Sequence, residues 1–113
     1  MATQKLEASG WRAYLDNVSR VITGQHTEIE IAGLAIGDQI EAKWLPLTGL
    51  TYDSKGDLFE VATETVDHLI RQPKEIYVEY GADGLHSVEV IDADGNHQII
   101  KLKSPIALEA LKD

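Results

Sequence analysis

The stretch from Glu75 to Leu102, EIYVEYGADGLHSVEVIDADGNHQIIKL, decides the fold of this chain. Apolar and polar residues alternate along it, which is typical of β-strands with one dry face and one solvated face. Two turns rich in glycine and aspartate, Gly81–Gly84 and Asp92–Asn96, divide it into three strands. Strands joined by such short turns must be antiparallel, because a parallel pair needs a long crossover.

The alternation also predicts which side chains share a face. In the first of these strands, Ile76, Val78 and Tyr80 share one face. In the second strand, Val88 and Val90 lie on one face, and Leu85 and Ile91 lie on the other.

The same two-residue period recurs before Glu75. It predicts strands over residues 28–31, 39–44, 47–52 and 58–63. The segment Asp67–Pro73 is ambiguous, because Leu69 and Ile70 suit a strand while Pro73 must end any element that contains it. The sequence leaves open whether this segment is a strand or a helical turn.

One helix is predicted near the N-terminus, over Gly10–Thr23. Ser9 is suited to cap it, because the hydroxyl can accept a hydrogen bond from a free backbone N–H of the first turn. Gly24 is suited to end it in the left-handed conformation. The apolar residues recur at the spacing that gives a helix one apolar face: Trp11, Tyr14, Leu15, Val18 and Ile22.

These elements predict a single α+β domain over residues 1–113, with residues 1–8 as a flexible lead. The amphipathic helix is expected to pack on the dry face of a six- or seven-stranded antiparallel meander. Periodicity does not decide whether this sheet stays open or curls into a partial barrel. Ser104 followed by Pro105 predicts a short C-terminal helix over Ile106–Leu111.

Composition excludes several classes of function. The 113 residues carry a net charge of −9 and no cysteine, which excludes disulfides, thiol catalysis and cysteine-ligated metal sites. The acidic charge repels nucleic acid and anionic lipid, and no stretch reaches the ~20 apolar residues that cross a bilayer. We expect a cytoplasmic protein that binds neither nucleic acid nor membrane. No motif indicates a cofactor or a metal.

The acidic turn Asp92–Asn96 is similar to the start of a calcium loop, in which carboxylates two residues apart face one cation. Such a loop needs glycine at its sixth position and glutamate at its twelfth. This chain has His97 and Lys103 there. We therefore interpret Asp92–Asn96 as a hairpin turn.

Three polar residues form the candidate site, namely His68, Tyr52 and Asp53. His68 lies between Asp67 and the apolar Leu69, where an imidazole can act as acid, base or switch, or can serve the structure by bonding a backbone carbonyl. Tyr52 and Asp53 end a strand at a loop, where functional groups are often presented. Equally, Asp53 can initiate the turn while Tyr52 covers the edge of the core.

Four local strings stand in a recognisable order. They are W-x-x-Y-L-D from Trp11, W-x-P-L-x-G-L-x-Y-D from Trp44, H-L-I-x-x-P from His68 and V-x-D-x-D-G from Val90. Together they resemble an uncharacterised family of short bacterial proteins, a domain of unknown function, over Trp11–Leu102. The resemblance implies a bacterial source and a stand-alone domain, and it adds interest to Tyr52, Asp53 and His68, which lie in its strings. It implies no activity, ligand or catalytic residue.

Two classes of function remain. The first is a non-enzymatic module that acts through a protein partner or its own dimer, and an unpaired strand at the first or last position of the sheet would support strand addition. The second is a small enzyme or ligand-binding domain around His68, Tyr52 and Asp53, with the imidazole as general base. The second class requires the three side chains to converge in one pocket.

Overall fold

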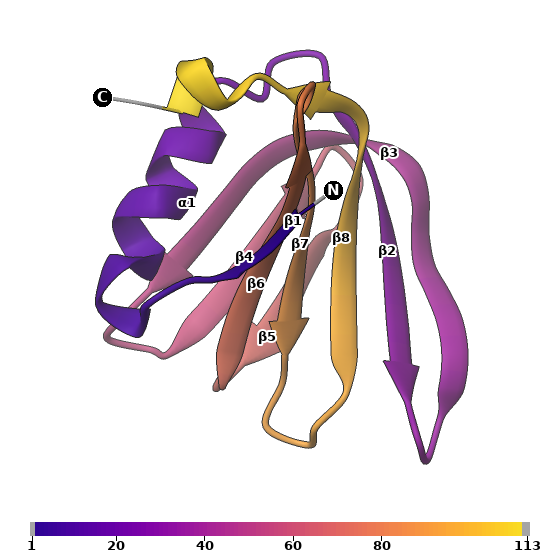
Figure 1. The fold of residues 1–113 in the computed structure, drawn as a ribbon. Helices are drawn as coiled ribbons and strands as arrows, with labels where there is room; N and C mark the ends of the chain where they lie inside the picture. Colours follow the sequence, from indigo (N-terminus) through magenta and orange to yellow (C-terminus); the bar gives the residue numbers. More distant parts are fainter. Residues whose placement is uncertain (1, 112–113) are drawn as a thin grey trace.

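An eight-stranded antiparallel sheet curls around one α-helix in the computed structural model, which describes residues 2–111 (Figure 1). The helix is α1 (Trp11–Arg20), and two 3-10 turns lie near the ends, η1 (Ala8–Gly10) and η2 (Leu108–Leu111). The strands are β1 (Ala2–Lys5), β2 (His26–Gly33), β3 (Gly37–Asp53), β4 (Leu58–Thr63), β5 (Asp67–Arg71), β6 (Glu75–Gly81), β7 (Gly84–Ile91) and β8 (His97–Ile106). The α+β class and the antiparallel sheet are confirmed, but the sheet has eight strands where six or seven were predicted.

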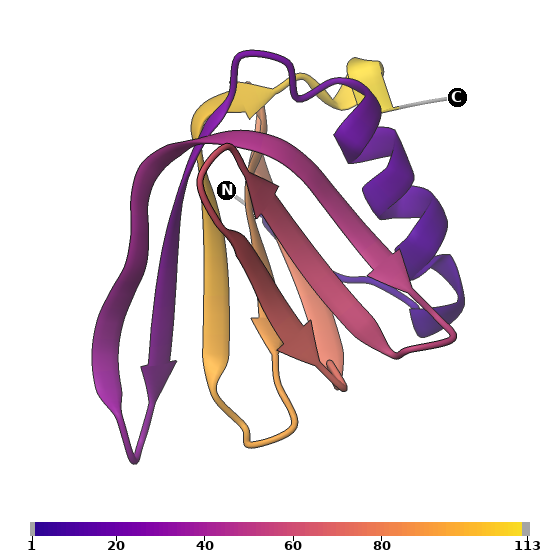
Figure 2. The same ribbon diagram turned by 180° about the vertical axis from the view of Figure 1, so that it is seen from behind.

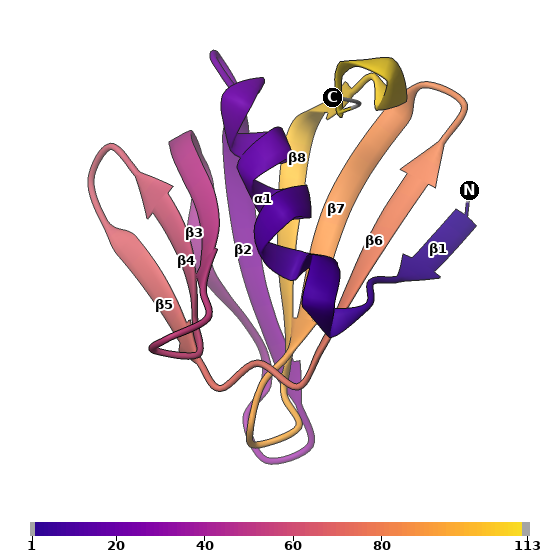
Figure 3. The ribbon, with the colours of Figure 1, turned by 90° about the vertical axis from the view of Figure 1, so that its left-hand side faces the viewer.

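The strand order in the sheet is β1-β6-β7-β8-β2-β3-β4-β5. The sheet consists of two meanders, β2 to β5 and β6 to β8, which are joined where β2 pairs with β8. Strand β1 adds to the outer side of β6. The sheet curls without closing into a barrel, so β1 and β5 remain at its two edges (Figures 2 and 3). An open sheet always leaves two strands with unpaired backbone groups on one side.

The helix α1 lies against the inner face of the curl (Figure 3). Its buried side chains, Trp11, Leu15 and Val18, belong to the predicted apolar face. They contact a core formed by alternate residues of the strands, of which the following are fully buried: Ile29, Leu50, Phe59, Val61, Ile76, Val88, Val90 and Ile100. Burying each such side chain contributes about 1.5–3 kcal/mol relative to leaving it exposed, and this burial holds the helix on the sheet.

Ser19 connects α1 to β3 through two hydrogen bonds. Its Oγ accepts a bond from the Leu50 N–H at 2.9 Å and donates one to the Leu50 carbonyl. Both backbone groups of Leu50 are thereby satisfied beneath the helix.

The helix is shorter than the predicted range Gly10–Thr23. Ser9 lies inside η1, and Gly10 occupies the N-cap position with no side-chain hydrogen bond, so the prediction of a Ser9 cap is wrong. The 3-10 turn satisfies the Gly10 N–H instead, through the Glu7 carbonyl at 2.9 Å. Gly24 does adopt the left-handed conformation, with φ of 82°, but it lies beyond the helix end.

Strand β3 is a single long strand where two were predicted. Pro46 suggested a break, yet the ladder passes through it because the strand bends and its pairing with β2 contains bulges near Ile29 (Figure 1). At this bend Trp44 has φ of 54°, which is uncommon for a bulky residue.

Both ends of the chain differ from the predictions. Ala2–Lys5 pairs with β6 as β1, where we expected a flexible lead, and the Lys5 ammonium bonds to Glu75 at 2.8 Å. At the other end, Ser104 and Pro105 continue β8, because Ile106 pairs with Leu85. The predicted C-terminal helix is reduced to η2, and residues 112–113 lie outside the described range.

Strand pairing settles two local points. Asp67–Arg71 is strand β5, paired with β4 over its whole length. Leu85 is fully buried together with Val88 and Val90, so its predicted place on the opposite face is wrong. A register shift between Leu85 and Ser87 changes the alternation there.

Candidate functional site

Tyr52 and Asp53 organise the loop after β3. The Tyr52 ring packs edge-on against Trp11, with ring centroids 5.2 Å apart, and its hydroxyl donates to Asp57 Oδ1 at 2.7 Å. Asp53 Oδ1 accepts from the Lys55 N–H at 3.0 Å, which is the turn-forming role open to aspartate. Both residues line a shallow hollow of about 320 Å³.

Asp57 controls the ionisation of Tyr52. The hydrogen bond to Asp57, assisted by burial, raises the pKa of Tyr52 to about 12 from its ordinary value of 10.0. The hydrogen bond to Asp57 also makes the protonated phenol a fixed donor, which suits it to hold the loop rather than to act as a base.

This raised pKa predicts a stability change in alkali. A group whose pKa is higher in the folded chain contributes stability that is complete below the unfolded pKa, near 10, and is lost as the pH rises through about 12. The difference in absorbance titration between the wild type and Tyr52→Phe reports Tyr52 alone, and we expect its midpoint near 12. Asp57→Ala should move that midpoint towards 10, and a wild-type midpoint already at 10 would contradict the interpretation.

His68 lies on the inner face of the curled sheet and contacts a strand that is not its neighbour. Its Nε2 lies 2.6 Å from Gln98 Oε1 on β8. Gln98 Nε2 donates to Asp92 Oδ2 at 2.9 Å, and Asp92 Oδ1 accepts from the backbone N–H groups of Asp94 and Asn96 at 3.0 and 2.9 Å. Asp92, Gln98 and His68 thus form a relay that joins β5 to the β7–β8 hairpin.

The relay fixes the tautomer of His68. Because the Gln98 amide donates to Asp92, only its oxygen is free to face the imidazole, and His68 must donate from Nε2. Nε2 carries a proton in this neutral tautomer and also in the cation, so the bond survives either state. Asp92 and Gln98 are both buried, at 8% and 7% exposure, and this geometry assigns His68 a structural contact across the core.

The structure does not bring His68 to Tyr52 and Asp53. His68 pairs with Val61 of β4, whereas Asp53 pairs with Leu58 at the far end of that strand. Two strand spacings and three residues separate His68 from Asp53, roughly 14 Å between Cα atoms. On β4 the fully buried Phe59 lies opposite Tyr52 and the fully buried Val61 lies opposite His68, so the three side chains do not share one pocket.

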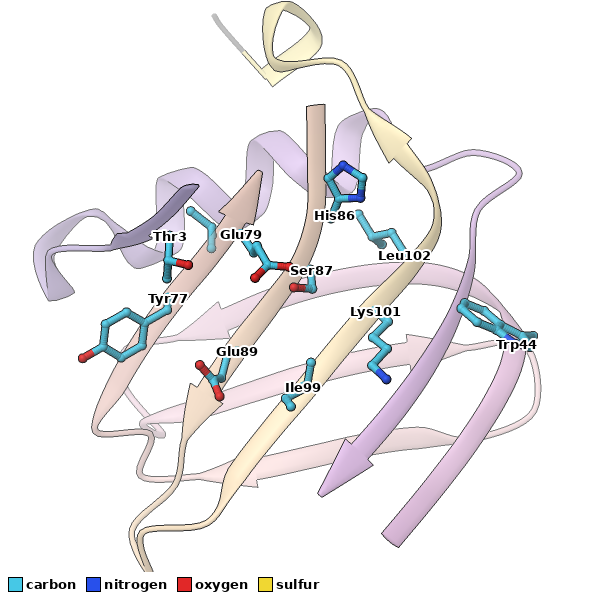
Figure 4. A pocket seen from close by; sticks show the side chains of 11 residues that line it. Thr3, Trp44, Tyr77, Glu79, His86, Ser87, Glu89, Ile99, Lys101 and Leu102 are labelled. Carbon is cyan, nitrogen blue, oxygen red and sulfur yellow. The ribbon is translucent and has the colours of Figure 1, made fainter. Parts of the chain in front are cut away.

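A larger hollow, of about 440 Å³, lies on the outer face of the sheet (Figure 4). Trp44, turned outward at the bend of β3, lies at one end of this hollow, across β2 from Lys101 (Figure 4). The basic side chains that line this hollow, Lys101 and His86, already pair with carboxylates of the same chain. Lys101 Nζ contacts Glu30 at 2.9 Å and Glu28 at 3.4 Å, and His86 contacts Asp83 at 2.6 Å. Within residues 2–111, no group of three or more histidines and carboxylates is arranged to hold a metal ion.

The free edge of β5 carries backbone groups that no neighbouring strand pairs with. The Thr63 N–H bonds to the Val66 carbonyl at 3.0 Å, and the Gln72 N–H bonds to the Asp57 carbonyl at 2.8 Å. Val66 and Gln72, which flank β5, are both even-numbered. Because antiparallel ladder bonds recur at every second residue, the even-numbered residues between them, His68 and Ile70, also bond to β4. The odd-numbered residues therefore direct both backbone groups to the free edge: Asp67, Leu69 and Arg71.

The side chains of these three residues are exposed on the outer face of the sheet. Leu69 is 43% exposed, and Val66 in the preceding turn is 51% exposed. Asp67 and Arg71 have no hydrogen-bond or ion-pair partner within the part of the chain that the structure describes. We call Asp67, Leu69 and Arg71 with their outward backbone groups the β5 edge. Figure 3 shows this strand at the rim of the sheet.

Comparison with known proteins places the chain in a family. The model of a family of unknown function, DUF5335, matches residues 2–111. The chain belongs to the DUF5335 family. An uncharacterised protein of Aquifex aeolicus (strain VF5) is 41% identical over 109 residues, which cover 96% of this DUF5335 chain and 98% of that relative. The predicted resemblance to an uncharacterised bacterial family is confirmed.

No solved structure matches this DUF5335 chain. The helices within residues 2–111 are all too short or too polar to cross a membrane.

Sequence patterns alone do not reveal the β5 edge of this DUF5335 chain. Asp67 is notable in the sequence only as a neighbour of His68, and no motif distinguishes Arg71. The available signal was a five-residue segment, DHLIR, with an acid and a base placed symmetrically about Leu69. The sequence does not identify this strand as an edge, because that depends on the order of distant strands.

Proposed function

We propose that this chain is a non-enzymatic interaction module that binds an extended polypeptide segment along β5, as one further strand of the sheet. The observation that carries the proposal is the pattern of hydrogen bonds along β5. The even-numbered residues bond to β4, so the backbone N–H and C=O groups of Asp67, Leu69 and Arg71 point to the free edge. A row of unpaired strand groups is a template for strand addition.

Three of the devices that protect an edge are absent from β5. It carries no lysine, no proline and no bulge, and it pairs with β4 without a register shift. Its two charged side chains, Asp67 and Arg71, have opposite signs, so a segment of complementary charge can still pair with them. The opposite edge, β1, is different, since it carries Lys5 and presents no large exposed hydrophobic side chain. These contrasts favour β5 over β1 as the docking edge.

The exposed side chains define the chemistry of the segment. An antiparallel segment would place one side chain opposite each of Asp67, Leu69 and Arg71. The favoured sequence therefore has a basic residue opposite Asp67, an apolar residue opposite Leu69 and an acidic residue opposite Arg71. Gln72, with φ of 52°, and Pro73 end the strand, which limits the docked segment to about five residues.

The expected affinity is modest. Three residues with one N–H and one C=O each offer six backbone groups. A net gain of about 0.5–1.5 kcal/mol per hydrogen bond is offset by the ordering of the segment, which gives a Kd on the order of 0.1 mM.

A peptide titration followed by NMR tests this proposal. A capped peptide with the sequence of residues 65–72 supplies the favoured charges in antiparallel orientation. We expect it to shift the amide resonances of Asp67, Leu69 and Arg71 and to saturate below a few millimolar. The same peptide methylated at its leucine nitrogen is the matched control, since it lacks the central donor, and it should bind at least fivefold more weakly.

Two results would overturn the proposal. One is no change in the β5 resonances up to several millimolar peptide. The other is a change that spares β5 and falls on β1 or on the loops. Leu69→Pro supplies a second check, because it removes a donor that faces only the free edge and should abolish the shifts while the chain stays folded.

A further inference from the structure

We infer that the segment that docks on β5 is the β5 strand of a second copy of this chain. This inference rests on the proposed function and names its partner. The two strands would run antiparallel about a two-fold axis at Leu69, and the two sheets would continue into one. Such an interface is isologous, because the same surface is used by both copies.

The backbone groups that face the free edge of β5 can pair with each other across this two-fold axis. In an antiparallel pair centred on Leu69, each odd-numbered residue of one copy faces an odd-numbered residue of the other. Leu69 then exchanges bonds with its symmetry mate, and Asp67 exchanges bonds with Arg71 of the other copy. All three outward-facing residues are satisfied by the same three residues of the second copy.

The charges of Asp67 and Arg71 favour the register centred on Leu69 over the two adjacent registers. Centring on Leu69 places the Asp67 carboxylate opposite the Arg71 guanidinium of the other copy, twice per dimer. Centring on His68 would place Asp67 opposite Leu69 and leave Arg71 beyond the paired segment. Centring on Ile70 would place Asp67 opposite Pro73, which has no N–H to donate.

The exposed apolar side chain of the β5 edge and the net charge of that edge both favour a second copy of the chain as the partner. Leu69, 43% exposed in the single chain, would lie beside its symmetry mate on the outer face. The chain carries a net charge of −9, which disfavours contact between most parts of two copies. The three residues of the β5 edge have no net charge, because Asp67 and Arg71 cancel. The carboxylate of Glu60, opposite Leu69 on β4, lies one strand further from the second copy.

The test exchanges the two charges. Asp67→Arg places like charges opposite each other in a homodimer, and so does Arg71→Asp. Each single variant should weaken self-association at least tenfold in sedimentation equilibrium. An equimolar mixture of the two variants should associate as the wild type does, because every facing pair is then of opposite charge. The double variant, D67R with R71D, should also recover association.

Controls separate this effect from net charge and from folding. Lys43→Asp changes the net charge as much as Arg71→Asp does, at an exposed position on β3, and should leave association within twofold of wild type. Circular dichroism checks that each variant is folded. If one single variant fails to fold, the other and the double variant still decide the question.

The outcomes distinguish the two proposals. A wild-type chain that stays monomeric up to about 1 mM, while the β5 peptide binds, overturns the second copy as partner and leaves strand addition standing. A dimer that is indifferent to the charge variants also overturns the inference, because its interface lies elsewhere. A monomer that does not bind the peptide overturns both.

Discussion

Replacing Asp92 by alanine is expected to lower the free energy of unfolding by about 3 kcal/mol. The substitution removes the acceptor of two backbone N–H groups, those of Asp94 and Asn96, and the acceptor of the buried Gln98 amide. A buried donor left without a partner costs about 1–3 kcal/mol. The hairpin turn also loses the two bonds to the Asp92 side chain, although it keeps its backbone bonds between Asp92 and Asn96 and between Gly95 and Asp92. The melting temperature should fall by roughly 15 °C.

Urea unfolding of the Asp92→Ala and wild-type chains measures this difference. Asp94→Ala is the matched control, because Asp94 is exposed in the same turn and should cost less than about 0.5 kcal/mol. Equal losses from the two variants would contradict the relay and reduce Asp92 to an ordinary turn residue.

Asp92→Asn tests the direction of the relay. The asparagine oxygen can still accept from the turn, but its amide nitrogen would face the Gln98 nitrogen. Gln98 must then turn its amide, so that its nitrogen faces His68 and the imidazole becomes the acceptor at Nε2. We expect the neutral His68 tautomer to switch from Nε2–H to Nδ1–H, which the nitrogen chemical shifts of the ring report. A folded variant with an unchanged tautomer would contradict the assignment.

Local patterns were sufficient to predict most of the elements. The alternation in Glu75–Leu102 specifies three antiparallel strands, because the period and the glycine-rich turns act over a few residues only. The apolar face of α1 was predicted for the same reason. Where the local pattern is interrupted, as at Pro46 and Leu85, the prediction failed, because bulges and bends change the alternation.

The strand order could not be read from the sequence. The pairing of β2 with β8 and of β1 with β6 joins segments that are far apart in the chain, and no local motif encodes it. Whether a strand lies at an edge follows only from this order. The sequence of β5 therefore does not show by itself that this strand lies at an edge.

The candidate site was predicted only in part. Tyr52 and Asp53 do lie together at the end of β3, but His68 faces Gln98 across the core. A histidine beside an aspartate in the sequence does not reveal its partner, because adjacent strand residues point to opposite faces. Asp67 and His68 are such neighbours, because Asp67 lies on the outer face of the sheet and His68 on the inner face.

Amide hydrogen exchange along β5 tests the central claim most directly. In dilute solution the amides of His68 and Ile70, which bond to β4, should exchange at least a hundredfold more slowly than those of Asp67, Leu69 and Arg71. The three odd-numbered amides should become protected when the chain is concentrated or the β5 peptide is added. Odd-numbered amides already protected in dilute solution, or still unprotected with a segment bound, would contradict the account.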